Sequence, residues 1–173
     1  MTLRNAVLAV LASVLMVSAT PAFAADVVFT AALSGGDEGT KTGSTATGDS
    51  KLTVHTKTQT VDVTLKVVGI KFADLAAHLA HAPVGPMHLH LYAANGDVSL
   101  LLPFPMGPAY SETSDGFTLK LSGYPYADGA KILNSNVSFD DFLVAMKSGA
   151  VVFNIHTNKF ADGEISGKVM VAK

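Results

Sequence analysis

The segment KLTVHTKTQTVDVTLKVVG, residues 51–69, constrains the fold more than any other part of the chain because apolar and polar residues alternate along it. Leu52 and Val54, for example, alternate with Thr53 and His55. A period of two residues places the two sets of side chains on opposite faces of a β-strand. The segment therefore predicts an antiparallel hairpin with one apolar face and one solvated face.

Several other short segments have the composition of strands, and turn residues separate them. These segments are 26–33, 87–93, 98–102, 117–121, 151–157 and 164–171. Helical spacing is limited to residues 72–82 and to a second stretch that opens at Ser138, a suitable N-cap. We therefore expect an all-β domain, a single β-sandwich or Greek-key-like barrel of short antiparallel strands with two short helices.

The first 24 residues have the features of a signal peptide. Arg4 is followed by the apolar run Ala6 to Val17, and Ala22-Phe23-Ala24 provides a small-x-small cleavage site. The run is shorter than the roughly 20 residues that a membrane span needs. We predict that residues 1–24 are removed, that residues 25–173 form the mature domain without a membrane span, and that the protein is periplasmic or secreted.

The charge of the predicted mature chain excludes two classes of partner. Arg4 is the only arginine, so its removal from the 12 basic residues leaves 11 lysines against 14 acidic residues, a formal charge of −3. Such a chain lacks the basic surface of a nucleic-acid-binding protein and the polybasic cluster of a membrane-surface binder. It also has no cysteine, so neither disulfides nor a thiol nucleophile is available.

The histidines are the residues most suited to chemistry. His88 and His90 are one residue apart in a predicted strand, so both point to the same face. His156 lies in the later strand VVFNIHT, on the face that also carries Asn154. If these two strands are close together, the three imidazoles can share one ion, and nitrogen ligands favour Zn or Cu over Ca or Mg.

The alternative is that the histidines form hydrogen bonds with neighbouring groups on a half-exposed face and bind no metal. In the metal-binding interpretation, Asn154 and Glu164 form the second shell, with Glu164 suited to orient an imidazole through its other nitrogen. His78 and His81 are three residues apart in the predicted helix, and we interpret them as part of its solvent-exposed edge. We interpret His55 as a surface residue.

Three sequence blocks resemble the CHRD domain, a β-rich module named for its repeats in chordin and also present in exported bacterial proteins. The blocks are AALSGGDE (31–38), MHLHLYAANGDV (87–98) and FNIHTNKFADGEISGKV (153–169). By this resemblance, His88, His90, Asn154, His156 and Glu164 occupy motif positions. The resemblance implies a β-rich fold but no defined enzymatic activity.

The sequence thus favours a non-enzymatic binding module whose partner is an unknown protein or a metal ion, Cu or Zn. Two alternatives remain open at this stage. One is a copper-dependent redox enzyme resembling superoxide dismutase, which rests on fold-level analogy alone. The other is a purely structural or adhesive protein in which the histidines are bonded within the sheet.

Overall fold

The computed structural model describes residues 25–36 and 41–173, so the predicted signal peptide lies outside the described residues. Ten strands make up most of the fold. They are β1 (Val27–Ser34), β2 (Thr47–His55), β3 (Thr60–Val68), β4 (Met87–Tyr92), β5 (Val98–Phe104), β6 (Tyr110–Glu112), β7 (Gly116–Pro125), β8 (Val151–Ile155), β9 (Ile165–Lys168) and β10 (Met170–Val171).

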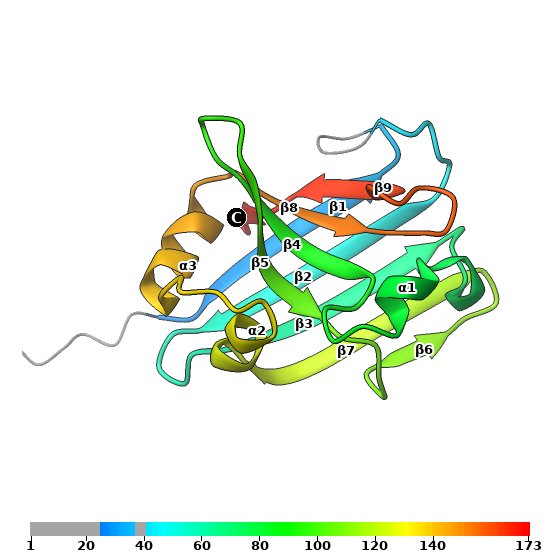
Figure 1. Ribbon diagram of the computed structural model, residues 1–173. Coiled ribbons are helices and arrows are strands. Elements are labelled where there is room, and N and C mark those ends of the chain that lie inside the picture. Colours follow the sequence, from blue (N-terminus) through cyan, green and yellow to red (C-terminus); the bar gives the residue numbers. More distant parts are fainter. Residues whose placement is uncertain (1–24, 37–40) are drawn as a thin grey trace, which may run out of the picture.

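All ten strands belong to one antiparallel sheet in the order β5-β4-β8-β9-β1-β2-β3-β7-β6, and β10 pairs with β1. The sheet curls into a half-barrel, which brings its two ends to face each other (Figure 1). The all-β prediction is therefore confirmed, in the form of a single curled sheet. Strands far apart in the sequence become neighbours where β8 lies between β4 and β9 and where β9 lies beside β1.

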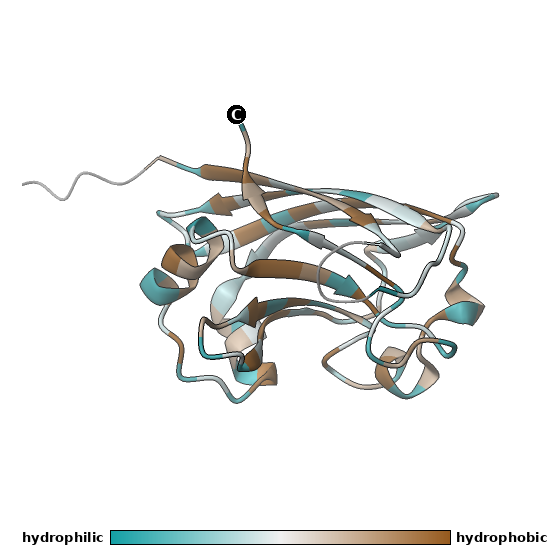
Figure 2. Cartoon of the chain, turned by 90° about the horizontal axis from the view of Figure 1, so that it is seen from above, coloured by the Kyte–Doolittle hydropathy of each residue, from teal (hydrophilic) through white to brown (hydrophobic). Residues whose placement is uncertain are grey.

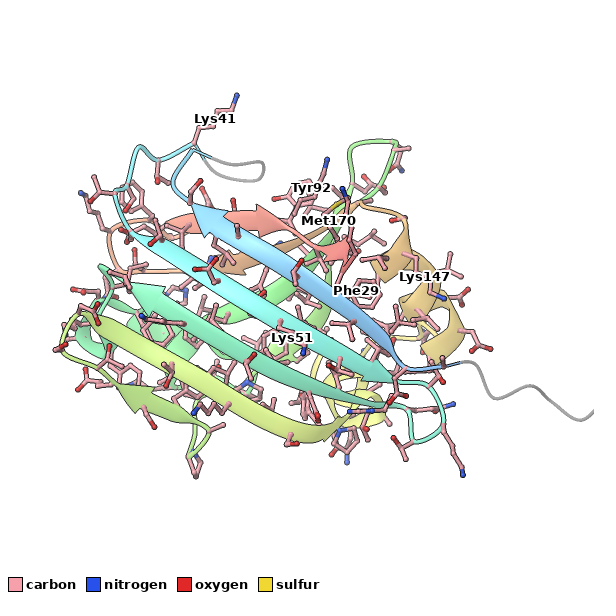
Figure 3. The ribbon with its side chains drawn as sticks, turned by 180° about the vertical axis from the view of Figure 1, so that it is seen from behind. Phe29, Lys41, Lys51, Tyr92, Lys147 and Met170 are labelled. Carbon is pink, nitrogen blue, oxygen red and sulfur yellow. The ribbon has the colours of Figure 1, made fainter. Side chains whose placement is uncertain are left out.

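The alternating segment forms the expected hairpin of β2 and β3. Leu52 is paired with Val63, and both side chains are fully buried. The polar row faces solvent, as Lys51 does on the outer side of β2 (Figure 3). The period of two in the sequence is thus the period of burial in the sheet.

The core lies inside the curl of the sheet and draws on strands from both of its ends. Leu89 of β4, Phe153 of β8 and Phe117 of β7 are all fully buried in the same apolar cluster. Apolar residues lie on the strands and on the helices, and the helices lie near the ends of the strands (Figure 2). Because Leu89 and Phe153 point into the core, their sequence neighbours on β4 and β8 must point to the opposite face.

The helices differ in number from the two that were expected. The described residues contain a short 3-10 helix, η1 (Phe72–Asp74), and three α-helices, α1 (Ala77–Ala80), α2 (Tyr126–Ile132) and α3 (Phe139–Lys147). In α3, Ser138 accepts a hydrogen bond from the Asp141 amide, as its N-cap position predicts. The unexpected helix α2 has no side-chain N-cap and contains Gly129, so it carries little local signal.

The expected helix over residues 72–82 is interrupted, and the interruption fixes part of the candidate site. Leu75 has an extended backbone and forms an isolated β-bridge with Thr157, while its side chain is buried in the core. The Ala76 amide then donates to the carbonyl of His156. These tertiary hydrogen bonds replace those of a continuous helix, which explains why the spacing of apolar residues was misleading.

Candidate metal centre

The two histidine-bearing strands lie side by side. β4 and β8 are antiparallel neighbours in which His88 is paired with Asn154 and His90 with Val152. Paired residues of antiparallel strands project to the same face, and His156 follows Asn154 by two residues. The register therefore places all three predicted ligands on the face of the sheet opposite the core.

The three imidazoles converge closely enough to share an ion. The ring centroids are 5.0 Å apart for His88 and His156, 5.6 Å for His88 and His90, and 5.7 Å for His90 and His156. One nitrogen from each ring lies within 4.8 Å of a nitrogen from each of the other two rings. A point therefore exists that is at most about 2.8 Å from all three nitrogens (4.8 Å divided by √3). A metal–nitrogen bond is about 2.0–2.1 Å long. Small side-chain movements, each under about 1 Å, close that difference.

Backbone carbonyls determine which nitrogen of two rings is available. His88 Nε2 donates to the Gly85 carbonyl at 2.6 Å, and His156 Nδ1 donates to the Ala161 carbonyl at 2.7 Å. A carbonyl oxygen can only accept, so the proton lies on the bonded nitrogen and the lone pair on the other. His88 Nδ1, His156 Nε2 and His90 Nε2 are buried without a hydrogen-bond partner, and a metal ion would satisfy all three.

Burial keeps these rings uncharged. Desolvation, followed by the proximity of His156, lowers the pKa of His88 from 6.5 to about 4, and the same two causes lower the pKa of His90 to about 4. Desolvation also lowers the pKa of His156, opposed in part by its hydrogen bond to Ala161 and by the charge of Asp162. Neutral imidazole is the form that binds metal, so all three rings are ready to bind near pH 7.

The comparison with protein families identifies the chain. The model of the CHRD domain matches residues 29–169, which include β4, β8 and all three histidines. The chain belongs to the CHRD domain family. No curated protein and no solved structure matched the chain. Among the described residues, no helix of this CHRD domain is long and apolar enough to cross a membrane.

Asn154 contacts the loop that holds His156. Its side chain is 1% exposed, and its Nδ2 donates to the Asp162 carbonyl at 3.0 Å. His156 bonds to the preceding carbonyl of the same loop, that of Ala161. Asn154 thus supports the loop that fixes the orientation of the His156 ring.

Glu164 does not orient an imidazole in this structure. Its Oε1 accepts a hydrogen bond from Ser44 Oγ at 2.7 Å, which ties the start of β9 to the segment before β2. The orienting role that the sequence analysis assigned to Glu164 belongs instead to the carbonyls of Gly85 and Ala161. A backbone acceptor has no side-chain signature, which is why residue types alone pointed to the carboxylate.

The glycines at the two supporting turns are the signal that sequence reasoning did not use. Gly85 has a φ of +71° and Gly163 a φ of +118°, conformations that L side chains rarely adopt. A Cβ on Gly85 would clash with the backbone of Phe104, and one on Gly163 would clash with the Asn154 amide. Glycines that flank a histidine strand in this way indicate a turn whose carbonyls point at the rings.

The other histidines lie outside this cluster. His78 and His81 are exposed, which agrees with a solvated edge, and the only described group of three or more potential ligands is that of His88, His90 and His156. His55 lies between two carboxylates: its Nδ1 is 2.7 Å from Asp26 and its Nε2 is 3.1 Å from Asp62. Hydrogen bonds to Asp62 and Asp26 raise the pKa of His55, the opposite of the direction in the buried cluster.

Proposed function

We propose that this protein is an exported CHRD-type binding module that holds one transition-metal ion, Cu or Zn, through His88, His90 and His156. Two observations carry the proposal: one nitrogen of each ring lies within 4.8 Å of a nitrogen of the other two rings, and each ring has one buried nitrogen without a hydrogen-bond partner. Two of these rings are oriented by carbonyls through their other nitrogen, the arrangement usual for metal-binding histidines.

The same observation argues against a purely structural role for the histidines. A ring that only stabilises the sheet would bond through both nitrogens, since an unpartnered buried polar atom costs free energy. Here each ring leaves one buried nitrogen without a partner. The rings also lie close together, so protonation of one opposes protonation of the next, as it does between His156 and His88. A shared ion would give each of the three nitrogens a partner and so remove the cost of burying it unpaired.

Export of the protein, to the periplasm or outside the cell, is part of the proposal. It is supported by the signal-peptide features of residues 1–24 and by membership of a family of extracellular-type modules. A histidine site needs no reducing environment, unlike a thiolate site, and the chain contains no cysteine.

Two conservative substitutions can remove a ligand while keeping the bond that orients the ring. Gln in place of His88 retains a side-chain N–H in reach of the Gly85 carbonyl, and Asn in place of His156 retains one for the Ala161 carbonyl. Each variant loses the nitrogen that faces the cluster. His81→Gln is the matched control, because His81 is exposed and outside the cluster.

The test is equilibrium dialysis of the purified mature chain against Zn(II) and Cu(II), with binding to wild type compared with that to the variants. We expect one ion per wild-type chain, unchanged binding by His81→Gln, and a loss of at least about 100-fold in affinity for His88→Gln and for His156→Asn, because loss of a ligand should cost more than the tenfold to 100-fold that loss of an outer partner costs. Equal binding by wild type and the His88→Gln/His156→Asn double variant would overturn the proposal. Circular dichroism confirms that each variant is folded.

A further inference from the structure

The donor set of the cluster contains no negative charge. Its three members are His88, His90 and His156, and no carboxylate of the described residues joins them. Asp162 acts on His156 from the exposed loop that covers it. Lys168 is paired with Val152, which is itself paired with His90, so a lysine lies on the same face one strand away. The donor set therefore offsets none of the charge of a bound ion, and Asp162, which acts on His156, is itself exposed to solvent.

Burial makes this lack of negative charge significant. His88 is 3% exposed and His156 is 7% exposed, so an ion between them loses most of its hydration. The cost of moving an ion from water into a low-dielectric interior grows with the square of its charge, so a divalent ion costs about four times as much as a monovalent ion of the same size. Neutral imidazoles leave that difference largely uncompensated.

The number of ligands also bears on the choice of ion. Zn(II) held by three histidines takes a water as its fourth ligand, whereas the cluster provides three nitrogens on rings of which His88 and His156 are almost fully buried. Cu(I) has a filled d shell, as Zn(II) has, but carries only one charge and is stable with three ligands in a plane. Three nitrogens within 4.8 Å of one another form a triangle that can close around such an ion.

We infer that the site formed by His88, His90 and His156 selects monovalent copper over divalent ions. The inference rests on the proposed function, since it specifies the ion held by the same three residues. Copper bound here is retained when it is reduced, and the reduced form is the more tightly bound of the two.

Leu100 offers a way to change the charge without touching a ligand. It is paired with His90 across β4 and β5, and its side chain is 38% exposed. Leu100→Glu places a carboxylate beside the site at a position that tolerates a polar side chain. Leu100→Gln is the matched neutral control. Neither substitution alters a ligand or one of the carbonyls that orient the rings.

The experiment measures three affinities by competition with coloured chelators of known affinity: Cu(I) under anaerobic conditions with a reductant, and Cu(II) and Zn(II) without it. For wild type and Leu100→Gln we expect Cu(I) to bind at least about tenfold more tightly than either divalent ion, and for Leu100→Glu we expect that ratio to fall. If Cu(II) or Zn(II) binds as tightly as Cu(I), the inference is overturned and the proposed metal site remains. If none of the three ions binds to wild type more tightly than to the His88→Gln/His156→Asn variant, both the inference and the proposed metal site are overturned.

Discussion

Lowering the pH should destabilise the metal-free protein through its histidine cluster. In the folded protein, burial lowers the pKa of His88 and of His90 to about 4, while an unfolded chain has the ordinary value of 6.5. As the pH falls below 6.5, the unfolded chain takes up protons that the folded protein does not. The free energy of unfolding therefore falls as the pH is lowered from 6.5 to about 4. Above pH 6.5 the two rings are neutral in both states and do not affect stability. Well below pH 4 they are protonated in both states, so their effect on stability no longer changes.

The size of this effect follows from the two pKa values. At pH 4.5 an unfolded ring is almost fully protonated and a folded ring is largely neutral, which corresponds to about 2 to 3 kcal/mol for each of His88 and His90. Together they give about 5 kcal/mol as an upper bound, which is a large part of the 5–15 kcal/mol typical of a domain. A bound metal ion opposes the effect, because it competes with the protons.

Urea unfolding of the metal-free protein between pH 7.5 and pH 4.5 measures this effect, with His90→Leu as the comparison. His90 is half-buried and makes no hydrogen bond through Nε2, so leucine can occupy its place. Carboxylates titrate alike in both proteins, so the difference reports the His90 ring together with its smaller effect on the pKa of His88. The loss of stability should be smaller in His90→Leu by about 2 to 3 kcal/mol. Parallel pH profiles, or NMR titration midpoints near 6.5 for His88 and His90, would refute the reasoning.

Three further predictions concern other parts of the molecule. Gly163→Ala should destabilise the protein by about 1–3 kcal/mol and weaken metal binding, because the new Cβ would displace the Asn154 amide. Urea unfolding measures the loss of stability and equilibrium dialysis measures the loss of metal affinity. Unchanged metal affinity would contradict the role given to this turn. Phe153→Ala should cost about 3–5 kcal/mol in chemical denaturation, since the ring is fully buried in the core, and a loss below 1 kcal/mol would contradict that packing. His55→Gln should cost less than about 1 kcal/mol, because the ion pairs with Asp26 and Asp62 are exposed. That cost should be largest between pH 3.8 and pH 6.5. The pKa of His55 is raised, so the stability that His55 contributes is lost as the pH rises above this window, and the pKa of Asp62 is lowered, so the stability that Asp62 contributes is lost as the pH falls below it. A cost independent of pH would contradict this assignment.

Local patterns in the sequence were sufficient to predict an element wherever residues close together in the sequence determine its backbone conformation. The alternation around Leu52 and Val63 predicted a hairpin that the structure contains, and Ser138 predicted the start of α3. The helix expected over residues 72–82 was wrong in its middle, because Leu75 pairs with Thr157, more than 80 residues away in the sequence. A long-range hydrogen bond leaves no trace in local spacing, so this break was not predictable.

The sequence by itself determined that His88 and His90 share a face and that His156 shares its own strand's face with Asn154, since alternation along a strand depends only on position. Only the tertiary structure decided that β8 lies next to β4, because sheet order depends on how the whole apolar surface is buried. It also decided which nitrogen of His88 and His156 is free, since that depends on how the neighbouring turns present the carbonyls of Gly85 and Ala161 to the rings. Residue identity supplied the imidazoles, and the packing of the sheet determined where their lone pairs point.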